Sequence, residues 1–231
     1  MGKIKSDHNK FELRSLEMKQ FMDNALEELK AFHDYAIEND IEYSIRSGSA
    51  IGYLTTKNYL PWDDDIDISY NNKCYDNILN LFNSGVLSEN IWKDNNWEFR
   101  SINLNNQSYY MAKLVGAHYN RFKPHSFFKL LKNNNQIFKN QNDLGGLDIF
   151  PQRTFADKID HELKFNSKPI KIKFAGIDTM LLYDEQHINE MIRIYGHPST
   201  WGTYLNEFNL SEIKIRTENL NKLFNDFKIN K

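Results

Sequence analysis

The chain has 231 residues, of which 40% are hydrophobic and 14% aromatic, so it can fold around one sizeable core. Its formal net charge of -2 gives no general attraction to nucleic acid or to an anionic membrane, and we expect neither as a partner. The single cysteine, Cys74, excludes an intramolecular disulfide and a cysteine-based zinc site, and without an 18-residue apolar run or an apolar N-terminal segment we expect a soluble, cytoplasmic protein with no integral membrane segment.

The first part of the chain is predicted to alternate between helices and strands. Apolar residues three and four apart indicate an amphipathic helix over 16–39, and the alternation in IEYSIRS indicates a strand over 41–47. GSAIGYLTT opens with small residues that can cap a helix and predicts a short helix over 48–56, entered through a tight turn. DIDISY alternates again and predicts a strand over 65–70, and CYDNILNLFNSG predicts a helix over 74–85.

The rest of the chain is predicted to add strands and two helices. Strands are expected at 97–104, 108–116, 145–151 and 168–176, and helices at 184–196 and 210–229. Residues 117–143 are basic, aromatic and rich in asparagine, and we expect a variable, loop-rich insertion there, lying over a site. No internal repeat and no linker is visible, so the sequence predicts a single α+β domain over 1–231, with a mixed sheet flanked by helices.

The stretch PWDDDIDI places four carboxylates within five positions. Side chains two apart in a strand point the same way, so Asp65 and Asp67 share one face while Ile66 and Ile68 face the core. Two adjacent carboxylates are costly unless a cation neutralises them, and Mg²⁺ prefers such oxygen ligands together with substrate phosphates. The stretch therefore indicates a divalent metal site for phosphate chemistry; a solvated acidic turn after a proline is the alternative.

The sequence around this stretch favours the metal site. Gly48 and Ser49 open a helix, and a helix N-terminus with small residues binds phosphate through its backbone N–H groups. A phosphate site followed by a carboxylate pair is the pattern of the nucleotidyltransferase fold, which usually adds a third carboxylate from a later strand. Asp148, between Leu147 and Ile149, is the best candidate for it, and a strand-end aspartate in a turn is its alternative reading.

The segment GSAIGYLTTKNYLPWDDDIDI resembles, without a gap, the signature of the LicD family, whose relatives include phosphorylcholine transferases and fukutin-type sugar-alcohol phosphate transferases. LDIFP at 147–151 resembles the second motif of that family, and IYGHPSTW at 194–201 loosely resembles its closing segment. The family's arginine falls on Thr55, and Arg46-Ser47 stand where Asp-Gly or Ser-Gly is common. A basic contact to the donor phosphate is therefore expected from Arg46 or Lys57.

The resemblance implies a nucleotidyltransferase-like fold and a LicD-type phosphotransferase activity. The donor would be CDP-activated, carrying choline, ribitol or a similar group, and the acceptor would be a glycan hydroxyl. Asp65, Asp67 and Asp148 carry over as ligands of Mg²⁺ or Mn²⁺ and as catalytic residues, with a general-base role as the alternative for Asp148. Gly48 and Ser49 carry over to donor binding.

Other residues have two readings each. Lys113 is a candidate phosphate contact, although a lysine on a strand is more often solvated. Trp62 either stacks on the donor or, as we favour, packs beneath the acidic loop, and Asp64 points away from Asp65 and suits a supporting role. The basic segment with Arg121, Lys123 and His125 either covers an anionic donor or is ordinary positive surface.

Two alternatives to the phosphotransferase remain open at the level of sequence. One is a nucleotidyltransferase that moves a nucleotide from a nucleoside triphosphate to a small molecule or protein; it would release pyrophosphate, whereas the phosphotransferase would release CMP. The other is a catalytically inactive domain of the same fold that holds a cation without turnover. The intact carboxylate set and the glycine turn argue against the second.

Overall fold

The computed structural model describes residues 8–60, 63, 65–87, 96–115, 125–132, 145–156, 159–201 and 210–229, and its fold is α+β, as predicted. The helices are α1 (His8–Glu38), α2 (Ser47–Thr56), α3 (Tyr75–Asn83), α4 (Glu185–Tyr195) and α5 (Leu210–Phe227), with 3₁₀ turns η1 (Asn72–Cys74) and η4 (Pro198–Thr200). Within the described ranges, no helix combines the length and the apolar character needed to cross a membrane.

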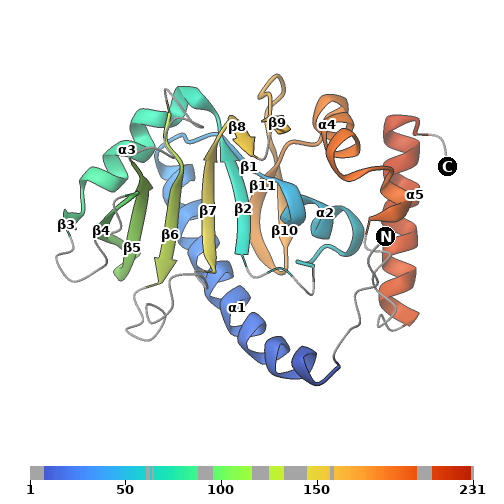
Figure 1. Ribbon diagram of the computed structural model, residues 1–231. Helices are drawn as coiled ribbons and strands as arrows, with labels where there is room; N and C mark the ends of the chain where they lie inside the picture. Colours follow the sequence, from blue (N-terminus) through green and yellow to red (C-terminus); the bar gives the residue numbers. More distant parts are fainter. Residues whose placement is uncertain are drawn as a thin grey trace.

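A seven-stranded mixed sheet organises the molecule (Figure 1). In spatial order its strands are β1 (Tyr43–Ile45), β2 (Asp65–Tyr70), β7 (Gly146–Pro151), β6 (Phe128–Lys132), β5 (Gln107–Leu114), β4 (Trp97–Leu104) and β3 (Val86–Leu87). Only β2 and β7 run parallel; the other neighbours in this sheet are antiparallel. Two hairpins lie outside the sheet, β8 (Arg153–Ala156) with β9 (Ile159–Glu162) and β10 (Ile170–Phe174) with β11 (Ile177–Leu181).

The main core lies between α1 and one face of this sheet. The buried stripe of α1 recurs every three or four residues and consists of Met22, Ala25, Leu29, Phe32 and Ala36. It meets the alternate residues of β2 and β7, which are fully buried: Ile66, Ile68, Leu147 and Ile149. Their alternation with aspartates fixes which way the aspartates point, so burial of this face is what orients the candidate site.

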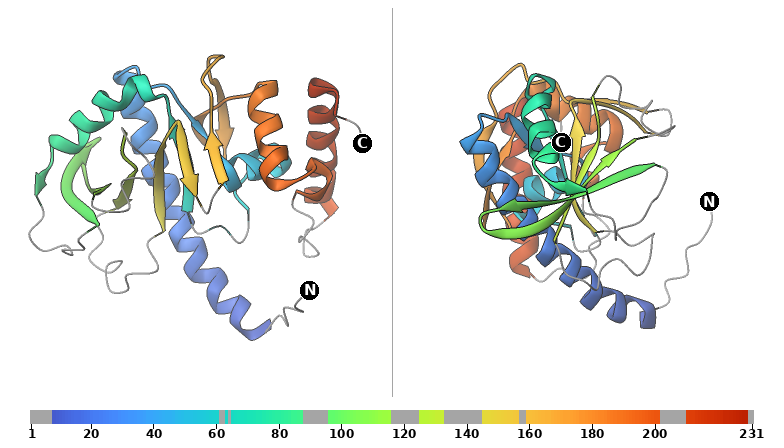
Figure 2. Two further views of the ribbon diagram at one scale, coloured as in Figure 1. Left: turned by 45° about the horizontal axis from the view of Figure 1, so that its top comes forward. Right: turned by 90° about the vertical axis from the view of Figure 1, so that its left-hand side faces the viewer.

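The helices lie at different parts of the sheet. Figure 1 shows α1 crossing behind the sheet, while α2, α4 and α5 gather beside the β1–β2 end, and Figure 2 shows the same grouping from another side. The Nδ2 atom of Asn219 in α5 donates to the carbonyl of Thr55 in α2 at 2.8 Å, which ties these two helices together. The opposite face of the sheet carries the aspartates.

Several elements differ from the sequence predictions. Residues 128–132 lie inside the segment 117–143 that was expected to be loop-rich, yet they form β6 in the middle of the sheet. The strand was missed because FKLLK is short, carries lysines and is surrounded by polar residues, and its pairing with β5 and β7 is non-local.

The remaining differences are at element ends and in short strands. Strand β1 ends at Ile45, because Arg46 is already the N-cap residue of α2, and α1 begins at His8. The short strands that the sequence pattern did not indicate are β3, β8, β9 and β11.

Candidate metal centre

Three carboxylates from two adjacent strands come together on the aspartate-bearing face. Asp65 and Asp67 point the same way from β2, and Asp148 lies directly beside Asp67 in the parallel register between β2 and β7. One carboxylate oxygen from each residue lies within 4.8 Å of the other two. Three oxygen ligands that converge in this way from rigid strands suit a divalent cation such as Mg²⁺.

Electrostatics around Asp67 indicate that negative charge predominates in the centre. Burial raises the pKa of Asp67 well above its usual value, and the neighbouring carboxylates of Asp65 and Asp148 raise it further. The Arg46 guanidinium acts in the opposite direction and lowers this pKa. A carboxyl group in such surroundings either holds a proton or shares a metal ion, so the donor set fits a cation.

Lys129 on β6 also belongs to this centre, although the sequence analysis did not propose it. It pairs with Asp148 across the β6–β7 ladder, and its Nζ lies 2.9 Å from Asp148 Oδ1, with both side chains only 12% exposed. Burial alone would lower the pKa of Lys129, but the charges of Asp148, Asp65 and Asp67 outweigh it, so the net pKa is raised. The alternation in FKLLK, with Lys129 between Phe128 and Leu130, was the signal that could have found it.

The turn between β1 and α2 holds the main chain of Asp67. The backbone N–H of Arg46 donates to the carbonyl of Asp67 at 2.9 Å, and the N–H of Asp67 donates to the Ser49 hydroxyl at 3.0 Å. Ser49 is buried inside the first turn of α2 and is not its N-cap residue. The structure therefore gives its side chain a positioning contact with the centre.

Gly48 is required for a close approach in the same turn. A Cβ atom added to Gly48 would lie 2.7 Å from Oδ2 of Asp63, so a side chain at this position would displace that carboxylate. The N-terminus of a helix attracts anions, and here the Asp63 carboxylate lies against the first turn of α2. A phosphate could take the position expected for it only if Asp63 moved.

Arg46 is buried beside the carboxylates. Its Nη1 donates to the Ser69 hydroxyl at 2.8 Å, and its guanidinium lies 4.9 Å from the centre of the Phe150 ring. Ser69 and Phe150 follow Asp67 and Asp148 by two residues on β2 and β7, so they belong to the same sheet face. Burial lowers the pKa of Arg46 while the charge of Asp67 raises it. The structure thus places Arg46 beside the centre.

Two lysines proposed from the sequence do not join the centre. Lys57 is the C-cap residue of α2, about 15 Å along the helix axis from its N-terminus, and its Nζ lies 3.9 Å from the Tyr53 ring centre. Lys113 shares a sheet face with Phe128 and Met111, opposite to the aspartates, and lies over the Phe82 ring. The sequence alone could not place Lys113, because a lone strand does not reveal which of its faces carries the site.

Four further residues considered in the sequence analysis lie outside the described residues: Trp62, Asp64, Arg121 and Lys123. His125 is described and packs edge-on against Tyr75, with 5.2 Å between ring centres.

Comparison with known proteins identifies the family of the chain. Residues 40–178, well over half of the chain, match the family described as LicD/FKTN/FKRP, nucleotidyltransferase domain. The chain is also similar to the crystal structure of an antigenic nucleotidyltransferase-like protein from Paracoccidioides brasiliensis, at 13% identity and a TM-score of 0.33, covering 88% of this chain and 76% of that one. No curated protein sequence matches. The family match includes all three carboxylates and the turn at Gly48, and the chain belongs to the LicD/FKTN/FKRP family.

Proposed function

We propose that the protein is a metal-dependent transferase that moves a phospho-substituent from a CDP-activated donor to a glycan hydroxyl. The observation that carries the proposal is the convergence of Asp65, Asp67 and Asp148 within 4.8 Å on one half-buried sheet face. Membership of the LicD/FKTN/FKRP family supports a transferase acting on glycans. The CDP donor and the choice of Mg²⁺ or Mn²⁺ are parts of the proposal.

Asp65, Asp67 and Asp148 would hold the cation, which when bound neutralises charge on the donor phosphates. Arg46 and Lys129 add two fixed positive charges beside the carboxylates and suit contact with the donor. The acceptor hydroxyl attacks the phosphorus in line, the bond to the CMP oxygen breaks, and CMP leaves. The hydroxyl proton passes to solvent or to a carboxylate of the centre.

Asp148 suits the role of ligand better than that of general base. Its ion pair with Lys129 favours the ionised carboxylate, and an ion-paired carboxylate is a weak proton acceptor at neutral pH. Ser49 and Gly48 contribute through protein contacts, since one fixes the main chain of Asp67 and the other leaves room for Asp63.

Release of CMP tests the proposal directly. The protein is incubated with CDP-choline, CDP-ribitol, CDP-glycerol or CDP-ethanolamine, with Mg²⁺ or with EDTA, and free CMP is measured. We expect metal-dependent CMP from at least one donor, and none from the Asp67→Asn protein. Pyrophosphate released from a nucleoside triphosphate, with no CMP from any CDP donor, would instead support the nucleotidyltransferase alternative. A Lys113→Ala protein is the matched control, because this lysine lies on the opposite sheet face.

A further inference from the structure

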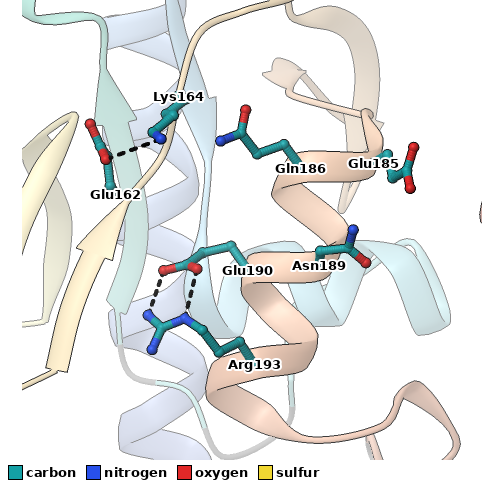
Figure 3. Close-up of a pocket in the computed structure, with 7 residues that line it drawn as sticks. All are labelled: Glu162, Lys164, Glu185, Gln186, Asn189, Glu190 and Arg193. Atoms are coloured by element: carbon teal, nitrogen blue, oxygen red, sulfur yellow. Dashed lines mark hydrogen bonds and ion pairs between the residues drawn. The ribbon is translucent and has the colours of Figure 1, made fainter.

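A polar groove lies between α4 and the segment that follows β9. It is open to solvent and has a volume of about 750 Å³, within the range of small-molecule sites. Figure 3 shows Glu162 and Lys164 on one side and the exposed face of α4 on the other. The lining residues are Glu162, Lys164, Glu185, Gln186, Asn189, Glu190 and Arg193.

The groove adjoins a smaller cavity at the turn between β1 and α2. This cavity of about 20 Å³ shares Glu162 and Glu190 with the groove and is also lined by Arg46, Ser47 and Tyr195. Arg46 is the residue whose backbone N–H donates to Asp67. The charge of Asp67 also contributes to raising the pKa of Tyr195, after the larger effect of burial. The smaller cavity has room for about one water molecule, or for one hydroxyl group of a molecule bound in the groove, next to the turn that holds Asp67.

The lining suits a neutral, hydroxyl-rich molecule rather than an anion. Glu162 lies 3.6 Å from Lys164, and the Glu190 carboxylate receives two hydrogen bonds from Arg193 at 2.7 and 2.8 Å, so most charges are compensated locally. With Glu185 the lining carries three acidic and two basic groups, which gives a diphosphate no net attraction. The amides of Gln186 and Asn189 add both donors and acceptors, as hydroxyl groups require.

The helix that carries these groups is fixed at both ends. The Asp184 side chain accepts from the N–H of His187 at 2.9 Å and caps α4, and Gly196 ends the helix at φ 79. Ile188 and Met191 are buried beneath it. The lining residues of α4 recur at helical spacing on the opposite, exposed face, so the groove wall is preorganised.

We infer that this groove is the acceptor subsite and binds an uncharged sugar unit of the glycan, with the reacting hydroxyl directed toward the carboxylate centre. The inference rests on the proposed function and assigns the acceptor to α4 and the anionic donor to the aspartates. Gln186, Asn189 and Arg193 are then specificity-determining residues.

NMR of the ¹⁵N-labelled full chain tests the assignment. The side-chain NH₂ signals of Gln186 and Asn189 are identified by their loss in Gln186→Ala and Asn189→Ala proteins. Lactose, maltotriose, N,N′-diacetylchitobiose and ribitol are then titrated, and CDP serves as the anionic probe. We expect saturable shifts of both signals with at least one neutral compound, and at least tenfold weaker binding of that compound to Arg193→Ala. Asn221→Ala, an exposed asparagine on α5, should bind normally.

The outcomes separate this inference from the proposed function. Asp67→Asn should still bind the neutral compound while losing CMP release. If none of the four neutral compounds shifts the groove signals, or if CDP shifts them and the neutral compounds do not, the acceptor assignment is overturned, whatever the CMP assay shows. If a neutral compound binds the groove but no CDP donor yields CMP, the assignment of the groove to a glycan transferase fails with the proposed function.

Discussion

Glu28 on α1 makes the stability of the fold depend on pH in an unusual direction. Its side chain is 1% exposed, and one carboxyl oxygen accepts the backbone N–H of Lys132 at the end of β6. Burial raises its pKa to about 8 from 4.5, although the N–H groups of Lys132 and Leu147 and the charge of Lys129 act to lower it. At neutral pH the folded protein therefore holds this carboxyl protonated, whereas the unfolded chain ionises it.

The sign and size of the effect follow from this proton. Between pH 4.5 and about 8 the folded state binds one more proton than the unfolded state at Glu28, so this residue's contribution to the free energy of unfolding falls as pH rises. The slope is about 1.4 kcal/mol per pH unit, and the whole window amounts to at most about 5 kcal/mol. Glu28→Gln cannot ionise and keeps a similar shape, so it should lose this dependence.

Urea unfolding of wild type and Glu28→Gln at pH 5.5, 6.5, 7.5 and 8.5, with EDTA present, measures the effect. The free energy of unfolding of the variant minus that of wild type should rise with pH by about 1.4 kcal/mol per unit below pH 8. Glu27→Gln is the matched control, because Glu27 is an exposed neighbour on the same helix. A Glu28→Gln difference that stays constant over the four pH values would refute the reasoning.

Three further predictions concern the carboxylate centre. Asp67→Asn removes one of the crowded charges, so in calorimetry the metal-free variant should melt at a higher temperature than metal-free wild type. Mn²⁺ should raise the melting temperature of wild type but not that of the variant. Lys129→Met leaves Asp148 without its buried ion-pair partner and should lower the free energy of unfolding in urea by about 3–5 kcal/mol. Saturating Mg²⁺ should restore part of this free energy. An equal loss with and without Mg²⁺ would argue against a site shared by Lys129 and the cation. Gly48→Ala should change unfolding free energy by no more than about 1 kcal/mol yet reduce CMP release, because the added Cβ displaces the Asp63 carboxylate; unchanged CMP release would show that Asp63 has no part in the site.

The sequence predicted the carboxylates because their signal is local. Alternation by two places Asp65 with Asp67, and puts Asp148 opposite Leu147 and Ile149, without any knowledge of neighbouring strands. The parallel pairing of β2 and β7, with Asp67 beside Asp148, was not predicted from the sequence, because strand pairing is non-local; this register comes from the structure.

The lysines were harder to assign because their placement depends on pairing between distant segments. Lys113 and Lys129 both alternate with apolar residues, and they occupy opposite faces of neighbouring strands. Tertiary packing decides which face of β5 contacts α3 and which face of β6 lies beside the aspartates. A buried lysine also contradicts the expectation that lysines are solvated, and that expectation holds except where a carboxylate partner compensates the charge.

The net charge of the carboxylate centre indicates which kind of ion would stabilise it. Among the described residues, the carboxylates that act on Asp67 or on one another are Asp63, Asp65, Asp67 and Asp148, and the nearby cations are Arg46 and Lys129. Glu28, with its pKa of about 8, adds little negative charge at neutral pH. Four carboxylates and two cations leave a net charge of minus two when all are ionised, which one divalent cation would balance. The buried isoleucines and leucine beneath the aspartates, each contributing about 1.5–3 kcal/mol by burial, hold the strands together against this repulsion. The protein therefore maintains a site that a divalent cation would stabilise.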